Sequence, residues 1–274
     1  MGEDITDAAY DRYGEDYERW MAPIVGPAAV RLLDRLEDRV PDDRPIRLLD
    51  VGTGTGTLVL AALERWPRAV ATGVDPSRVM LGLAGTAARA RNLADRLSLA
   101  RGDAVDLPIE DASVELVVSS FVIQLVSSRA AMLREILRVL RPGGVAAVLT
   151  WQLDDESFEP DELVGDVIDE MGIVVPDAGP DGTRPYASPA SAAAELRRIG
   201  FRDVRATREW LDHRYTPRTF LNVVEHWTDD DIFASLSEPV RSELRSRILQ
   251  RLERRRPEEL RWRRPLVSVV GRRP

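Results

Sequence analysis

Three glycines occupy every second position in the run LLDVGTGTGTL, at residues 52, 54 and 56 of the 274-residue chain. Glycine costs backbone entropy and offers no side chain to pack, so such a cluster marks a turn with positive φ or a place where a ligand touches the backbone. A strand pattern precedes the run and a helical pattern follows it, and a helix N-terminus offers N–H groups and a positive dipole end. The run therefore predicts that Gly52, Gly54 and Gly56 form a turn that binds a small polar or anionic ligand.

The spacing of these glycines separates several classes of enzyme. A dinucleotide-binding turn has the pattern G-x-G-x-x-G, but the sixth position here is Thr57, because the third glycine comes one residue early. A phosphate-binding P-loop needs a lysine, and all 38 Lys and Arg positions are arginine. The motif disfavours an NAD(P)-linked oxidoreductase and excludes a P-loop enzyme.

Short apolar segments alternate with longer helical patterns from residue 46 onward, which is typical of βαβ units in a parallel sheet. The expected fold is α/β: a doubly wound, mainly parallel seven-stranded sheet with helices on both faces and helical lid insertions. The predicted strands are 46–51, 69–74, 96–101, 114–120, 144–151, 201–210 and 260–274, and the predicted helices are 57–66, 77–92, 128–140, 154–172, 191–200 and 216–256.

Five segments in order resemble the motifs of the class I, Rossmann-like S-adenosylmethionine (SAM)-dependent methyltransferases. LLDVGTGTG resembles the first motif, GVDPS (73–77) the second-strand acid, GDAVDLP (102–108) the Asp-Ala pair after strand three, VELVVSSFVIQLV strand four with its loop, and RPGG (141–144) the turn before strand five. Ser-Ser-Phe after strand four resembles the small-molecule branch, which includes quinone-ring and natural-product enzymes. The resemblance implies SAM as the cofactor.

The resemblance covers residues 45 to 151 and implies how the rest of the chain is organised. An N-terminal helical lid segment is expected at 1–45, and a SAM-binding Rossmann-like core at 46–151. Residues 152–274 would form the second half of the same domain, with substrate-lid insertions at 152–190 and 212–256.

The nucleoside part of the cofactor is expected beyond strands two and three. By the resemblance, Asp75, with Pro76 beside it, would accept hydrogen bonds from both ribose hydroxyls. Asp103 would accept from the adenine amine while the N–H of Ala104 reaches the ring nitrogen. The residue types leave alternatives open, because Asp75 could cap the helix that starts near Ser77, and Asp103 could be a turn residue.

The methionine part of the cofactor is expected on the first turn. Asp50 would face its ammonium group, directly or through water, while Gly52 and Gly54 would let it lie flat. Ser119, after strand four, is expected beside the cofactor, and Ser120, Phe121 and Gln124 complete the approach to the methyl.

Aromatic residues of the N-terminal segment are expected to close the site. In YDRYGEDYERW, the residues Tyr10, Tyr13, Tyr17 and Trp20 could contact the sulfonium by cation–π interaction, or could fix a helix to the core instead. Tyr17 is the predicted cofactor contact. His226 is the candidate general base, with a structural role as the alternative. A base is optional, because methyl transfer from a sulfonium depends chiefly on aligning the acceptor.

The composition narrows the partners. With 38 basic and 46 acidic residues the net charge is −8, which argues against nucleic acid. Cysteine is absent, so thiolate metal sites are excluded, and no metal is predicted. The sequence shows neither a long apolar run nor a charged-then-apolar leader, so no membrane association and a cytoplasmic location are expected. The predicted partner is a small-molecule acceptor, with a homodimer left open.

The leading hypothesis is a SAM-dependent methyltransferase acting on a secondary metabolite or a quinone-like compound. The alternative keeps the cofactor but assigns it to a non-methylating cyclisation or rearrangement. An NAD(P)-linked oxidoreductase is the third class. Oxygen, nitrogen and carbon acceptors all remain open at this point.

Overall fold

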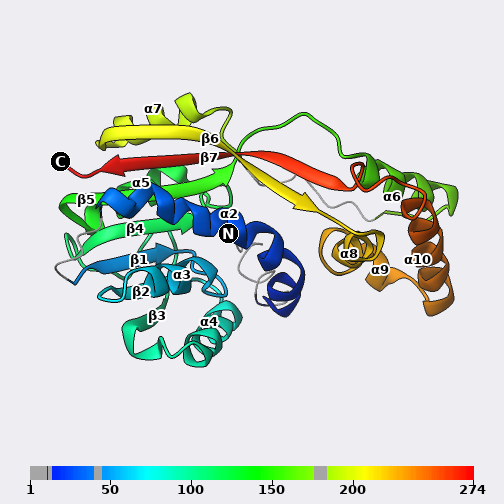
Figure 1. Cartoon of the computed structure of the whole chain (residues 1–274), viewed down its shortest axis with the longest axis horizontal. Helices are drawn as coiled ribbons and strands as arrows, with labels where there is room; N and C mark the ends of the chain where they lie inside the picture. The colour runs from blue at the N-terminus through cyan, green and yellow to red at the C-terminus, as the bar shows by residue number, and fades with distance from the viewer. Residues whose placement is uncertain (1–10, 12–13, 40–44, 176–183) are drawn as a thin grey trace.

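The computed structural model describes residues 11, 14–39, 45–175 and 184–274. One seven-stranded sheet organises the chain, in the order β3-β2-β1-β4-β5-β7-β6 (Figure 1). Strands β1 to β5 run parallel, and β7 is antiparallel to both of its neighbours. The predicted α/β fold is confirmed. The strands are β1 (Arg47–Val51), β2 (Val70–Asp75), β3 (Leu97–Arg101), β4 (Val114–Ser120), β5 (Leu140–Trp151), β6 (Arg202–Arg214) and β7 (Arg261–Arg272).

Helices cover both faces of the sheet because alternate strand residues point to opposite sides and both sides are apolar. Leu48 and Leu116 pack on the face covered by α2 (Ala22–Arg31), α3 (Thr57–Arg65) and α4 (Arg78–Ala90). Their neighbours Leu49 and Val117 pack on the opposite face, under α5 (Arg129–Val139) and α7 (Pro189–Ile199).

The chain order reverses direction across the sheet between β1 and β4, because β2 and β3 lie on one side of β1 and β4 lies on the other. In open α/β sheets, ligands bind beyond the carboxyl ends of the strands at such a switch point. The glycine turn after β1 and the loop after β4 meet there. They are in close contact, since a Cβ atom on Gly52 would collide with the side chain of Val122.

Strands β6 and β7 continue beyond the sheet as a two-stranded ribbon. The last pair between β5 and β7 is Trp151 with Leu266, whereas β6 and β7 stay paired as far as Arg214 and Arg261. The ribbon carries a helical lobe at the right of Figure 1. Its helices are α6 (Glu159–Glu170), α8 (Pro217–Val223), α9 (Asp230–Ser235) and α10 (Glu238–Leu252).

Two of the predicted helices differ from the structure in this lobe. The helix expected at 154–172 begins only at Glu159, since Pro160 fits the first turn of a helix and not its interior. The single helix expected at 216–256 is divided into three. A π-helical turn (Val224–Thr228) follows α8, and the backbone is extended at Leu236, before α10.

The N-terminal segment is helical throughout its described part after residue 14. A π-helical turn (Tyr17–Met21) leads into α2, and a 3-10 helix (Leu32–Arg39) buries its three leucines against the sheet. Tyr10 and Tyr13 lie outside the described residues, as do residues 176–183 of the predicted 152–190 insertion. None of the helices in the described ranges is both long enough and apolar enough to cross a bilayer.

Candidate functional site

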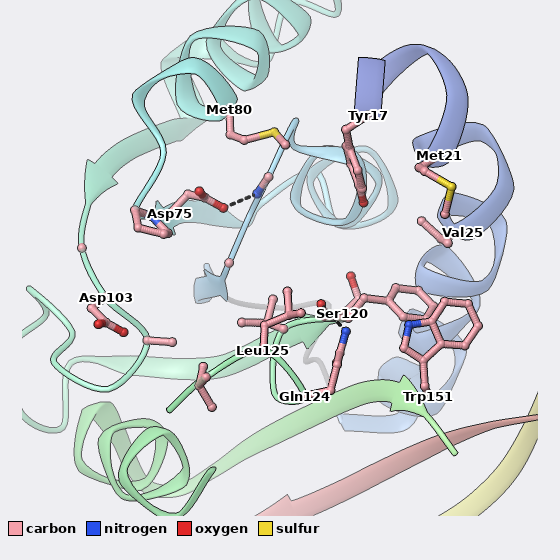
Figure 2. A pocket seen from close by; sticks show the side chains of 18 of the residues that line it. Tyr17, Met21, Val25, Asp75, Met80, Asp103, Ser120, Gln124, Leu125 and Trp151 are labelled. Carbon is pink, nitrogen blue, oxygen red and sulfur yellow. Dashed lines mark hydrogen bonds between the residues drawn. The ribbon is translucent and has the colours of Figure 1, made fainter. Parts of the chain in front are cut away.

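A cavity of about 300 Å³ lies beyond the carboxyl ends of β1 to β5, under the N-terminal helical segment (Figure 2). This volume is at the lower end of the range for small-molecule sites. The lining residues are Tyr17, Met21, Val25, Gly52, Gly54, Asp75, Pro76, Met80, Gly102, Asp103, Ala104, Ser120, Phe121, Val122, Gln124, Leu125, Val126, Ser127, Trp151 and Trp227.

The three glycines after β1 all have positive φ but differ in their surroundings. Gly54, with φ 53°, faces open space, since no atom lies within 4 Å of a Cβ built on it. Gly52 also lines the cavity, against Val122. Gly56 does not line this cavity: it caps α3, and a Cβ there would lie 3.2 Å from the Cβ of Ala84 in α4. Gly56 therefore packs against α4, whereas Gly54 faces the open cavity.

The glycine turn uses its N–H groups internally. Gly52 and Thr53 both donate to the carbonyl of Val74, at 2.8 and 2.9 Å. Gly54 donates to Asp75 at 2.8 Å, and Gly56 donates to Thr53 at 2.9 Å. These four N–H groups therefore already have acceptors within the protein, and ligand binding at the turn stays a prediction. The turn offers a flat peptide face instead.

Asp75 holds two backbone groups and lines the cavity as well (Figure 2). Its Oδ2 accepts from Gly54, and its Oδ1 accepts from the N–H of Ser77 at 3.0 Å. Ser77 caps α4, accepting from Met80 at 3.1 Å. Asp75 therefore supports the start of the helix, as one alternative proposed, and its place on the cavity wall leaves ribose recognition a prediction.

Asp103 and Ala104 lie at the other end of the cavity, beside Gly102. The Oδ1 of Asp103 accepts from the N–H of Val105 at 3.0 Å, and its carbonyl accepts from Asp106 at 3.1 Å. Asp103 is therefore a turn residue, which was one of the two roles that the sequence left open. This role coexists with a carboxylate on the cavity wall.

Asp50 lies beneath the turn and not on the cavity wall. It is 1% exposed, its Oδ2 accepts from the Thr53 hydroxyl at 2.9 Å, and its Oδ1 has no hydrogen-bond partner. Burial raises the pKa of Asp50 to about 7; the Thr53 hydrogen bond and, more weakly, the backbone N–H of Val59 oppose the rise, and the charge of Asp75 adds to it. A cation bound above the turn would reverse part of this shift.

Ser119 and Ser120 have different environments because successive strand residues point to opposite sides. Ser119 is fully buried, and its hydroxyl donates to the carbonyl of Val51 at 2.8 Å. It therefore joins β4 to β1 and does not line the cavity. Ser120 lines the cavity in its place.

Two π-helical turns place aromatic rings on the cavity wall. Tyr17 lies in the first and Trp227 in the second, and their rings meet edge to face with centroids 5.4 Å apart. Phe121 and Trp151 form a second pair, at 4.9 Å. Turns of this kind occur often at functional sites. Trp227 was not predicted as a site residue, and its only signal was its position beside His226.

His226 itself lies outside the cavity. Its side chain is 42% exposed, stacks on Trp20 with ring centroids 5.4 Å apart, and lies 3.7 Å from Glu225. Neighbouring residues of a helix point in different directions, so one of His226 and Trp227 faces the cavity and the other does not. The geometry gives no support to His226 as a general base.

The charge of the wall is one-sided. Of the lining residues in the described ranges, only Asp75 and Asp103 are charged, although the chain contains 38 arginines. Asp50 adds a third carboxyl group below the turn. No group of three metal-ligating side chains occurs among the described residues. The cavity therefore favours a ligand with positive charge.

Comparisons with known proteins identify the family. Residues 48–144 match the family described as "Methyltransferase domain". The chain is 35% identical over 168 residues to the ubiquinone/menaquinone biosynthesis C-methyltransferase UbiE of Dinoroseobacter shibae, covering 58% of this chain and 67% of that protein. It is 35% identical over 132 residues to a malonyl-[acyl-carrier protein] O-methyltransferase of Xylella fastidiosa, covering 48% of this chain but only 40% of that protein.

Solved structures share the fold. Phosphoethanolamine N-methyltransferase 2 of Haemonchus contortus, in complex with S-adenosyl-L-methionine, superposes with a TM-score of 0.61 at 20% identity, over 100% of this chain and 61% of that one. The chain belongs to the class I SAM-dependent methyltransferases.

The residues of the cavity fit SAM. The open face of Gly54 gives room for a flat amino-acid tail, and the unpartnered Oδ1 of Asp50 is a buried acceptor below it. A smaller adjoining cavity of about 40 Å³ extends behind the turn, where its wall includes Thr53, Thr55 and Thr57. These features suit a zwitterionic tail better than a pyrophosphate, which needs free N–H donors.

Proposed function

We propose that this chain transfers a methyl group from SAM to an uncharged, apolar small molecule, with a quinol-like ring or a related secondary metabolite as the acceptor. The observation that carries the proposal is the charge of the cavity wall, which has two carboxylates and no cationic side chain among its described residues. SAM bears a sulfonium and an ammonium. NAD(P) bears phosphates, which such a wall repels.

In this proposal the cofactor lies across the edge of the sheet. Asp75 and Pro76 hold the ribose, Asp103 and Ala104 hold the adenine, and the tail lies on Gly54. Tyr17 stands near the sulfonium, where its ring would stabilise the positive charge. The positions of these residues on one wall support the arrangement.

The acceptor side of the cavity is apolar and aromatic. Phe121, Trp151 and Trp227 line it, together with Met21 and Val25 of the N-terminal segment. Figure 2 shows Trp151, Met21 and Val25 on this side. A carboxylate acceptor, such as a malonyl group, would need a cationic partner there. The relative named as a C-methyltransferase of quinone biosynthesis is for this reason the better guide to the acceptor than the O-methyltransferase.

The side chains of the described wall act by positioning. SAM supplies an activated methyl group when bound. Tyr17, Asp75 and Asp103 are the only titratable side chains that line the cavity in the described ranges, and the two carboxylates are committed to the nucleoside. The aromatic rings would align the acceptor with the methyl and exclude water, which can supply much of the rate enhancement. The acceptor must then be nucleophilic without help from a carboxylate or imidazole base.

Titration calorimetry and a turnover assay test the proposal. Calorimetry should show binding of SAM and of S-adenosylhomocysteine and no binding of NADH. Mass spectrometry should detect a methylated product when 1,4-naphthoquinol is the acceptor. His226→Ala should keep its activity, because that ring lies outside the cavity. Binding of NADH without SAM binding would overturn the proposal. Tight SAM binding with no methylation of any acceptor in a metabolite panel would favour the rearrangement alternative.

A further inference from the structure

The backbone of Phe121 is held in an unusual conformation at the centre of the cavity wall. Phe121 follows directly after β4 and has φ 58°, in the left-handed region that bulky side chains rarely adopt. Such conformations persist only where the surroundings hold them, and they cluster at ligand sites. The structure shows what holds this one.

Three consecutive residues of β5 hold Phe121. Its N–H donates to the carbonyl of Leu149 at 2.8 Å, and its ring packs on Trp151. Between them, the Thr150 hydroxyl donates to the Oε1 of Gln124 at 2.6 Å, and the Nε2 of Gln124 donates to the carbonyl of Phe121 at 2.7 Å. Gln124 thus connects β5 to the strained residue.

Burial makes this connection costly to lose. Thr150 is 0% exposed and Gln124 is 3% exposed, so neither side chain can replace its partner with bulk water. The backbone of Gln124 also accepts from the N–H of Arg184, at 2.9 Å. One glutamine therefore anchors both the loop after β4 and the start of the chain segment that leads to α7.

The loop held in this way supplies much of the cavity wall. Seven of the lining residues belong to residues 120–127, and Val122 presses on Gly52 of the glycine turn. The loop therefore contacts the glycine turn through Val122 and carries Phe121 on the aromatic side of the cavity. A displacement of Phe121 would change the alignment of an acceptor without removing any group that touches the cofactor.

We propose that Gln124 and Thr150 are positioning residues, which lock the loop 120–127 and so set the angle at which an acceptor meets the methyl group. Thr150→Val is nearly isosteric and leaves the Oε1 of Gln124 without a donor. Thr150→Ser retains the hydroxyl and serves as the matched control. Gln124→Met removes the connection from its other end.

Two readouts keep this proposal separate from the proposed function. Hydrogen exchange followed by mass spectrometry reports on the loop directly, and only the turnover readout depends on methyl transfer. For Thr150→Val and Gln124→Met we expect exchange in a peptide covering 120–127 to rise about tenfold, with exchange in α10 unchanged. For the same two variants we expect kcat for 1,4-naphthoquinol to fall about tenfold, while the Kd of S-adenosylhomocysteine changes less than about threefold. Thr150→Ser should keep the wild-type exchange and the wild-type kcat.

Unchanged exchange in the loop, or faster exchange with an unchanged kcat, would overturn the positioning role. A parallel loss of cofactor binding and of kcat would also overturn it, because that is the result of general destabilisation. If the wild-type protein methylates no acceptor, the proposed function fails. The exchange experiment then still decides whether Gln124 and Thr150 lock the loop.

Discussion

Replacing Asp50 with asparagine should stabilise the cofactor-free protein at neutral and alkaline pH while it weakens SAM binding. Asp50 is 1% exposed, and one of its carboxylate oxygens has no partner. Burial raises its pKa from 3.8 to about 7 in the folded state. A raised folded-state pKa means that folding favours the protonated form, so the stabilisation is present below the unfolded-state pKa and is lost as the pH rises through about 7.

The size of the effect follows from the interval between the two pKa values. Each unit of pH between 3.8 and about 7 corresponds to about 1.4 kcal/mol, which gives a ceiling of about 4 kcal/mol. The asparagine side chain is neutral at every pH and has no such cost. Its oxygen can still accept from the Thr53 hydroxyl, which now donates to Asp50 at 2.9 Å. The variant should therefore gain stability over the wild type with increasing pH, up to that ceiling.

Urea unfolding of the two proteins between about pH 5 and pH 9, without cofactor, measures this difference. Titrating groups that do not interact with Asp50 cancel because both proteins carry them, whereas Asp75, whose charge interacts with that of Asp50, contributes to the difference. With SAM present the order should reverse, since the positive cofactor lowers the pKa of Asp50 and the variant lacks that charge; we expect a loss of affinity of roughly 1.5–3 kcal/mol. A variant less stable than the wild type at alkaline pH, or a difference independent of pH, would refute the reasoning.

Three further substitutions test the wall of the cavity. Gly54→Ala should abolish SAM binding because its Cβ enters the cavity. Gly143→Ala should leave calorimetric Kd values unchanged, although Gly143 also has a positive φ, of 80° against 53° for Gly54, and open surroundings. Asp75→Ala should weaken SAM binding by roughly 1.5–3 kcal/mol, and an unchanged Kd would remove the ribose assignment. Because two backbone N–H groups lose their acceptor, the variant should also lose about 1–2 kcal/mol of unfolding free energy. Trp227→Ala should raise KM for the acceptor about tenfold. The control Trp210→Ala should leave KM unchanged, because that ring is exposed and contacts Arg263; equal effects of the two variants would contradict the acceptor assignment.

The sheet was predictable because each of its strands has a local signal. Every predicted strand corresponds to an observed one, with ends that shift by a few residues. The helical lobe was less predictable. Its break at Leu236 does have a local signal that the prediction of 216–256 overlooked, because Ser237 and Pro239 mark the start of α10. Its π-helical turn is marked by neither Gly nor Pro. This turn packs against the first π-helical turn (Tyr17–Met21), and residue periodicity does not reveal a contact between such distant segments.

The site was predictable where a residue's position in the chain determines its place in space. Asp75 and Asp103 follow strand ends, so the topology brings both to the same edge of the sheet. The cofactor contact predicted at Ser119 is one residue away from Ser120, which lines the cavity. Strand residues alternate between two sides, and the sequence does not show which side faces the cavity. The same applies to His226 and Trp227 on a helix. The left-handed backbone of Phe121 had no signal, since a phenylalanine gives no warning of positive φ.

The charge distribution links the choice of cofactor to the release of product. Transfer of the methyl group removes the positive charge of the sulfonium, while Asp75, Asp103 and Asp50 keep their positions around the cavity. The same carboxylates that favour SAM therefore favour its product less, and the pKa of Asp50 rises again as the charge leaves. A wall containing arginine would lose this preference. In the proposed function, the absence of a cationic side chain from the described wall therefore favours both the binding of SAM and the release of its product.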